Sequence, residues 1–211
     1  MQWPASSNSA NSSRQPCSPR ALSYTMRMSI ADLGKQALLE LLSELGRRAS
    51  TLSDVELTVV GGSAGILTGQ LPAARTTTDC DVIRVDPAAS FAALRAVAAQ
   101  LSARRGLPED WLSDRVAELD VLPSGWRKRR VNIGTFGKLN IWCVGRLDLL
   151  AMKVYAGRMQ DRTDVLDMAP TPPEIAFVRR YLDQLRIPSR QANLDQIQSA
   201  LRFLDALESP Q

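Results

Sequence analysis

One arrangement in the sequence constrains the fold more than any other feature: a strand, a glycine-serine turn, a short helix and a second strand in direct succession. Residues 55–60 (Val-Glu-Leu-Thr-Val-Val) have the β-branched composition of a strand, and Gly61-Gly62-Ser63 follows them immediately. Residues 64–68 favour a short helix, and residues 80–85 favour a second strand. This order predicts an α/β fold in which both strands belong to one sheet.

Helical periodicity covers most of the remaining sequence. Ser29, with Asp32 three positions later, forms a capping pattern that predicts a first helix from there to Arg48. A third strand is expected at 139–144. The last third of the chain has helical spacing only, which predicts a helical C-terminal part. The other predicted helices lie at 88–104, 108–119, 147–157, 161–168, 173–185 and 192–207.

Composition divides the chain into three parts. Residues 1–28 are rich in Ser, Asn and Pro and lack the apolar centre of a secretory signal. They are predicted to be a disordered leader, or sequence upstream of a start at Met26 or Met28. An α/β part then covers 29–168 and a helical region covers 169–211.

The charge of the chain says little about its partners. The formal net charge is +4, and the leader supplies three arginines and no acidic residue. A local basic run at 126–130 (Trp-Arg-Lys-Arg-Arg) can bind an RNA backbone or be a solvated loop. No apolar run approaches the roughly 20 residues that cross a bilayer, so no membrane partner is expected. Three cysteines without zinc-site spacing fit a reducing cytoplasm.

The chain contains no histidine, which excludes histidine-dependent triads and histidine-ligated zinc or haem. Carboxylates are therefore leading candidates for chemistry. Asp79 and Asp81 flank Cys80 at the start of the second strand, where residues two apart point to the same side. Converging carboxylates repel each other unless a divalent cation lies between them, so the pair predicts a site for Mg²⁺ (or Mn²⁺). The alternative is an exposed strand with alternating polar residues.

The turn Gly61-Gly62-Ser63 lies at the start of the predicted short helix. Glycine permits positive φ and close backbone approach, while free N–H groups at the helix start and the Ser63 hydroxyl can hold a phosphate. Gly-Gly pairs are also ordinary turns. The turn and the aspartate pair at one edge of a sheet are more specific together than either is alone. They favour a phosphate site next to a metal site.

These parts resemble the nucleotidyltransferase superfamily of the DNA polymerase β type, whose hallmark is a Gly-Ser turn followed, after a short helix, by Asp-x-Asp. Fifteen residues separate Ser63 from Asp79. Residues 75–81 (Arg-Thr-Thr-Thr-Asp-Cys-Asp) and 149–164 are similar to the AbiEii-type branch, the toxin halves of bacterial toxin-antitoxin pairs. The resemblance implies a short mixed sheet flanked by helices over 29–168, an NTP substrate, Mg²⁺, and transfer of NMP to a hydroxyl.

The block at 149–164 can also be interpreted from its residues alone. If one helix continues through it, Lys153, Asp161 and Asp164 share a face from which Lys153 can reach a triphosphate. A solvated charged face is the alternative. The resemblance implies that Lys153 contacts phosphates and that Asp161 or Asp164 orients Lys153 or Arg158. The expected catalytic residues are Asp79, Asp81, Lys153, Asp161 and Asp164, and the expected nucleotide-binding residues are Gly61, Gly62, Ser63, Thr78, Lys153 and Arg158.

One departure from the superfamily pattern concerns a third carboxylate, which many members place on a later strand. Residues 138–142 offer Asn140 instead, and an amide cannot act as a base. Either Asp120, Asp148, Asp161 or Asp164 fills this role, or the fold binds nucleotide with weak or no catalysis. The AbiEii resemblance further implies a tRNA 3′ end as acceptor and an antitoxin as partner. A protein or small-molecule acceptor, or a catalytically silent nucleotide-binding module, are the alternatives.

Overall fold

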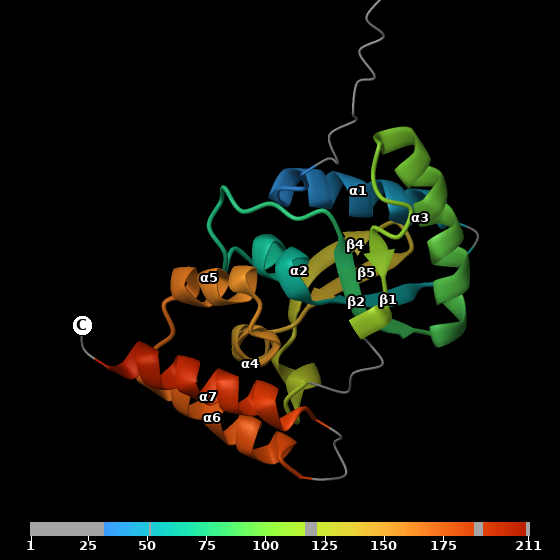
Figure 1. Cartoon of the computed structure of the whole chain (residues 1–211). Helices are drawn as coiled ribbons and strands as arrows, with labels where there is room; N and C mark the ends of the chain where they lie inside the picture. Colours follow the sequence, from blue (N-terminus) through green and yellow to red (C-terminus); the bar gives the residue numbers. More distant parts are fainter. Residues whose placement is uncertain (1–31, 51, 117–121, 188–191, 210–211) are drawn as a thin grey trace, which may run out of the picture.

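A five-stranded mixed sheet forms the centre of the protein (Figure 1). This computed structural model describes residues 32–50, 52–116, 122–187 and 192–209, so the predicted leader at 1–28 lies outside the described residues. The strand order is β3-β2-β1-β5-β4, in which β1 is antiparallel to β2 and parallel to β5. The predicted fold class is thereby confirmed. The strands are β1 (Val55–Val59), β2 (Cys80–Asp86), β3 (Leu112–Ser113), β4 (Val131–Phe136) and β5 (Leu139–Cys143).

Helices flank the sheet, and α4, α6 and α7 pack together away from α1 and α3 (Figure 1). This arrangement confirms the predicted helical C-terminal part, while the boundary at 168 stays a prediction. In the described ranges, no helix combines the length and apolar character that crossing a membrane requires. The helices are α1 (Lys35–Arg48), α2 (Gly61–Thr68), α3 (Phe91–Arg105), α4 (Arg146–Ala156), α5 (Met159–Met168), α6 (Pro172–Leu185) and α7 (Leu194–Glu208), with short 3₁₀ helices η1 (Ala88–Ser90) and η3 (Trp126–Arg129).

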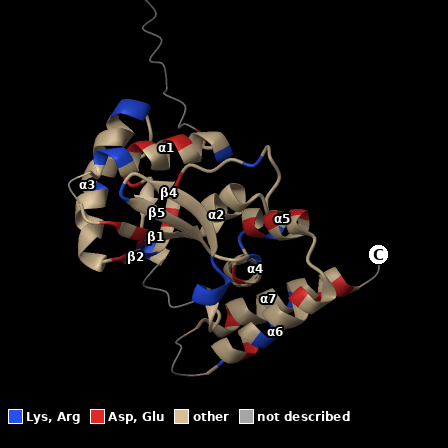
Figure 2. Ribbon diagram, turned by 180° about the vertical axis from the view of Figure 1, so that it is seen from behind, with Lys and Arg blue, Asp and Glu red and all other residues tan. Residues whose placement is uncertain are grey.

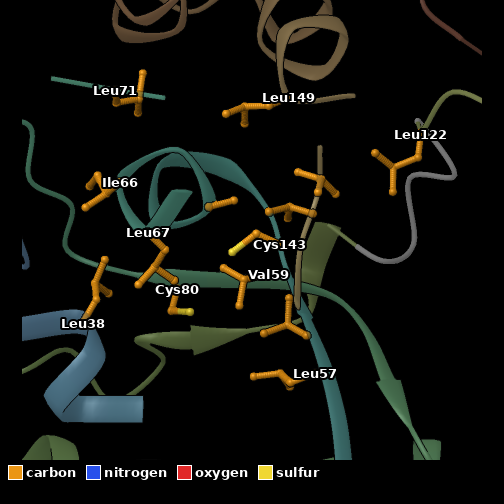
Figure 3. Close-up of a cluster of buried hydrophobic side chains, with 14 of the residues drawn as sticks. Leu38, Leu57, Val59, Ile66, Leu67, Leu71, Cys80, Leu122, Cys143 and Leu149 are labelled. Atoms are coloured by element: carbon orange, nitrogen blue, oxygen red, sulfur yellow. The ribbon is translucent and has the colours of Figure 1, made fainter. Parts of the chain in front are cut away.

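The core lies where one face of the sheet meets the helices. Along β1, Val55, Leu57 and Val59 alternate onto this face and are buried, as the two-residue period of a strand requires. Figure 3 shows Leu67 of α2 close to Cys80 of β2, with Leu149 of α4 on the other side of α2. The apolar helix α2 is therefore held between the sheet and α4, which fixes the position of its first turn.

The start of α1 differs from the sequence prediction. Asp32 to Gly34 are not helical, and α1 begins at Lys35 after Gly34 in extended conformation. The backbone of Leu33 instead exchanges two hydrogen bonds with Thr77, at 2.7 and 3.1 Å. The predicted capping serine, Ser29, lies outside the described residues. The bridge between Leu33 and Thr77 anchors the loop that leads into β2.

The helix predicted at 108–119 is wrong for its described part. Leu112 and Ser113 form β3, which pairs with Cys80 and Asp81 of β2. Trp111 is fully buried, and its indole N–H donates to the carbonyl of Ala98 at 3.0 Å. Burial of this large side chain together with pairing to β2 outweighs the local helical preference.

Candidate active site

The turn between β1 and α2 is the first element of the site. Gly61 has φ +67, which favours glycine, and a Cβ there would lie 3.1 Å from Oδ2 of Asp81. Helix α2 begins at Gly61 without a side-chain cap. The first N–H groups of a helix have no intrahelical acceptor, so this turn presents donors suited to an anion.

Hydrogen bonds hold the aspartate pair against this turn. The Ser63 hydroxyl donates to the backbone carbonyl of Asp79 at 2.5 Å, and Thr77 Oγ1 donates to Asp79 Oδ1 at 2.8 Å. The Val60 N–H donates to the Asp81 carbonyl at 2.9 Å. The structure thus brings Gly61, Ser63, Asp79 and Asp81 together at one end of the sheet.

Two predicted nucleotide-binding residues differ in exposure. Ser63 is buried, and its hydroxyl is occupied by Asp79, so in this conformation it braces the aspartate loop. Thr78 is exposed beside Asp79. A direct contact of either side chain with phosphate stays a prediction.

The electrostatics of the aspartate pair fit a divalent cation. Burial, followed by the negative charge of Asp79, raises the pKa of Asp81 to about 6, although Arg158 and Arg115 act in the opposite direction. The ion pairs among the described residues do not include Asp79 or Asp81. Two carboxylates that repel each other and form no ion pair with a described residue are a donor set suited to Mg²⁺ or Mn²⁺.

Lys153 of α4 is buried against two acidic residues of α5. Its Nζ lies 2.5 Å from Asp164 Oδ2 and 3.4 Å from Asp161 Oδ1, and its side chain is 4% exposed. Two separate helices cover this block, as predicted at 147–157 and 161–168: α4 ends at Ala156, Gly157 follows with φ +61, and α5 begins at Met159. The single helix that a shared face would require does not form. The break folds α5 back, so the three residues that were predicted to share a helix face meet across two helices.

Two arginines bind the outer sides of the same acidic residues (Figure 2 shows the charged residues of α5). Arg158 Nε donates to Asp161 Oδ2 at 2.6 Å, and Arg75 Nε donates to Asp164 Oδ1 at 2.9 Å. Burial alone raises the pKa of Asp164, but hydrogen bonds from Arg75, Lys153 and Gln160 hold that pKa below its ordinary value. We call Arg75, Lys153, Arg158, Asp161 and Asp164 the charged network.

One end of the charged network lies next to the glycine turn. Arg75 Nη2 lies 3.7 Å from the position that a Cβ on Gly62 would occupy, and Thr77 Oγ1 lies 3.5 Å from it. At the other end of the network, Arg158 acts electrostatically on both Asp79 and Asp81. The turn, the aspartate pair and the charged network therefore lie close to one another.

The sequence prediction did not include Arg75 or Thr77 among the site residues. Both lie in the block 75–81 that carries the resemblance, so their position just before Asp79 was an available signal. The partner of Arg75, Asp164, is 89 residues away in the chain, and no local pattern indicates that contact.

No third acidic residue joins the aspartate pair among the residues that the structure describes. Asp148 is bound by Arg129 at 2.6 Å, and Asp161 and Asp164 belong to the charged network. Asn140 accepts a hydrogen bond from Asn132 at 2.9 Å. Asp120 lies outside the described residues.

Two of the four cations in the basic run at 126–130 form ion pairs within the fold. Arg129 pairs with Asp148, while Arg130 pairs with Glu56 and stacks over the ring of Trp142 at 4.7 Å. Arg127 and Lys128 remain exposed. Two cations of the run are thus available to a polyanion.

The chain was compared with protein families, curated proteins and solved structures. Residues 36–169 match the profile of a family described as "Nucleotidyltransferase of unknown function (DUF6036)", and this span contains the turn, the aspartate pair and the charged network. Neither the curated proteins nor the solved structures contain a match.

Proposed function

Since the chain belongs to this family of nucleotidyltransferases of unknown function, we propose that it is a metal-dependent enzyme that transfers NMP from an NTP to an acceptor hydroxyl. The observation that carries the proposal is the aspartate pair, which has no cationic partner among the described residues and lies against the uncapped start of α2. A metal site and a phosphate site in contact are what a triphosphate with its cation requires.

Asp79 and Asp81 are the residues that hold Mg²⁺ or Mn²⁺ in this proposal. Their carboxylates would supply the hard oxygen ligands that these cations prefer. When bound, the metal neutralises charge at the transferring phosphoryl group and activates the attacking oxygen. Ser63 and Thr77 fix the Asp79 loop by their hydrogen bonds, so that the pair is positioned before substrate arrives.

The first turn of α2 and the charged network bind the triphosphate. Gly61 and Gly62 leave room for the backbone to approach phosphate oxygens, and their N–H groups donate. Lys153, Arg75 and Arg158 supply positive charge, and Arg75 does so directly beside Gly62. The acceptor oxygen forms a bond to the α-phosphorus while the bond from that phosphorus to the bridging oxygen breaks, and pyrophosphate leaves.

For the acceptor, we propose a tRNA 3′ end, with growth inhibition as the outcome and a cognate antitoxin as partner. Support comes from the resemblance of residues 75–81 and 149–164 to the AbiEii-type toxins. The exposed cations Arg127 and Lys128, next to Trp126, are a second supporting feature.

A catalytically silent nucleotide-binding module is the second candidate. It is favoured by the lack of a third carboxylate among the described residues, because no general base then accompanies the aspartate pair. Transfer to a protein or a small molecule is a further variant of the enzymatic proposal.

The test is incubation with each α-labelled NTP, Mg²⁺ and total tRNA. Label on RNA that is lost in Asp81→Ala supports transfer to RNA, and label on protein or small metabolites supports another acceptor. Binding without transfer supports the silent module. Asp86→Ala is the matched control, because Asp86 is an exposed aspartate at the other end of the same strand.

A further inference from the structure

We infer that Lys153 is a positioning residue, and that Arg75 and Arg158 are the cations that contact the phosphates of the nucleotide. This inference rests on the proposed function and divides the roles within the charged network. It replaces the expectation that the lysine itself reaches the triphosphate.

Lys153 is buried between two carboxylates. Its side chain is 4% exposed, and the two carboxylates that enclose it are 4% and 0% exposed. The ammonium group lies 2.5 Å from Asp164 and 3.4 Å from Asp161, so two of its three N–H donors are directed at protein oxygens. A phosphate that approached Lys153 would have to enter this buried site and compete with both carboxylates, each of which would lose one of its two cationic partners.

Arg75 lies beside the glycine turn and is partly exposed. Its side chain is 22% exposed, and Asp164 binds it through Nε at 2.9 Å and through Nη2 at 3.5 Å. Its Nη2 lies beside Gly62, where the first N–H groups of α2 point. Asp164 thus fixes the guanidinium, and Nη1 and the second N–H of Nη2 remain as donors. Together with the first N–H groups of α2, they form a combined site for phosphate oxygens.

Arg158 is exposed but anchored by an ion pair. Its side chain is 78% exposed, yet its Nε is held by buried Asp161 at 2.6 Å. It also lies within electrostatic reach of Asp79 and Asp81. This residue, at the N-cap of α5, therefore combines an exposed guanidinium with a fixed anchor close enough to the aspartate pair to act on it electrostatically.

The net charge of the charged network depends on Lys153. The network has three cations and two carboxylates, so it keeps one excess positive charge. Without Lys153, each acidic residue would be balanced by its own arginine, and the excess charge offered to phosphate would be lost. Lys153 also bridges Asp161 and Asp164, which sets the spacing of the two arginines.

The primary test compares the affinity for an NTP with the affinity for the corresponding NMP in Mg²⁺. We expect Arg75→Ala and Arg158→Ala each to weaken NTP binding about tenfold or more, with NMP binding nearly unchanged. Arg146→Ala and Arg105→Ala are matched controls, since both arginines form ion pairs elsewhere, with Glu174 and Glu44. If the Arg75 and Arg158 variants bind NTP like the wild type, the inference is overturned.

A mutant cycle then tests whether Lys153 acts through the arginines. As a single substitution, Lys153→Gln is expected to weaken NTP binding. Added to the Arg75→Ala/Arg158→Ala variant, it is expected to cause no further loss of NTP affinity. An equal loss in both backgrounds shows direct contact by Lys153 and contradicts the inference. The arginine variants decide the question without Lys153→Gln if that protein does not fold.

The two proposals fail differently. A wild-type protein that binds no nucleotide overturns the proposed function and this inference with it. A wild-type protein that binds NTP, with unaffected arginine variants, overturns the division of roles alone.

Discussion

Replacing Asp81 by Asn is expected to stabilise the folded protein at neutral pH. Burial, and then the charge of Asp79, raises the pKa of Asp81 from 3.8 to about 6. Between these two values the folded state binds more protons than the unfolded state, so stability falls as pH rises through this window. Above pH 6 the full cost of the buried charge is present, and Asn removes it.

The magnitude follows from the size of the shift. A shift of about 2 pKa units corresponds to at most about 3 kcal/mol, since one unit is worth about 1.4 kcal/mol. Asp81 is half-buried, and solvent screening reduces this figure to roughly 1–2 kcal/mol. For a chain of 211 residues this predicts a rise in Tm of roughly 2–8 °C.

The assay is thermal or urea unfolding without divalent cations, at pH 4 and at pH 7.5. We expect Asp81→Asn to be more stable than the wild type at pH 7.5 and to lose that advantage at pH 4. Asp86→Asn is the control, with a change below about 0.5 kcal/mol at both pH values. A variant that is destabilised equally at both pH values would refute the account of Asp81.

Three further substitutions test the packing that supports the site. Gly61→Ala is expected to lower the free energy of unfolding by about 1–2 kcal/mol because of its positive φ and the approach of Asp81, as measured by urea unfolding. Lys153→Met leaves two buried carboxylates without their shared cation and should cost about 3–5 kcal/mol at pH 7.5; a loss below 1 kcal/mol would contradict the network. Trp111→Ala should cost about 3–5 kcal/mol in the same assay, and an unchanged urea midpoint would contradict its place in the core.

Local patterns in the sequence were sufficient for the fold class and for one half of the site. Alternating apolar residues place Val55, Leu57 and Val59 on one face, and this periodicity is a property of the strand itself. The Gly61 turn and the aspartate pair are also close in sequence. Their proximity in space follows from two neighbouring strands joined by a short helix.

The remaining features depend on contacts between distant segments. Strand β3 has two residues and exists through its pairing with β2, so no periodicity could indicate it. Strand β4 carries Gly134 with φ +141 at a register shift, and its mixed composition gives no clear alternation. Leu33 leaves the helical pattern because its backbone pairs with Thr77.

The other half of the site shows the same limit. The sequence indicated that Lys153, Asp161 and Asp164 act together through a shared face of one continued helix. In the structure, two helices separated at Gly157 bring them together. The contact of Arg75 with Asp164 joins a loop before β2 to α5, and only the folded chain shows it.

The most direct measurement of the central claim is a Mn²⁺ titration followed by electron paramagnetic resonance, in the presence of an NTP analogue that cannot be cleaved at the α-phosphate. The account predicts that the wild type binds Mn²⁺ together with the analogue, and that Asp79→Asn/Asp81→Asn loses this binding while remaining folded. Equal Mn²⁺ binding by both proteins would contradict the assignment of the aspartate pair as the metal site.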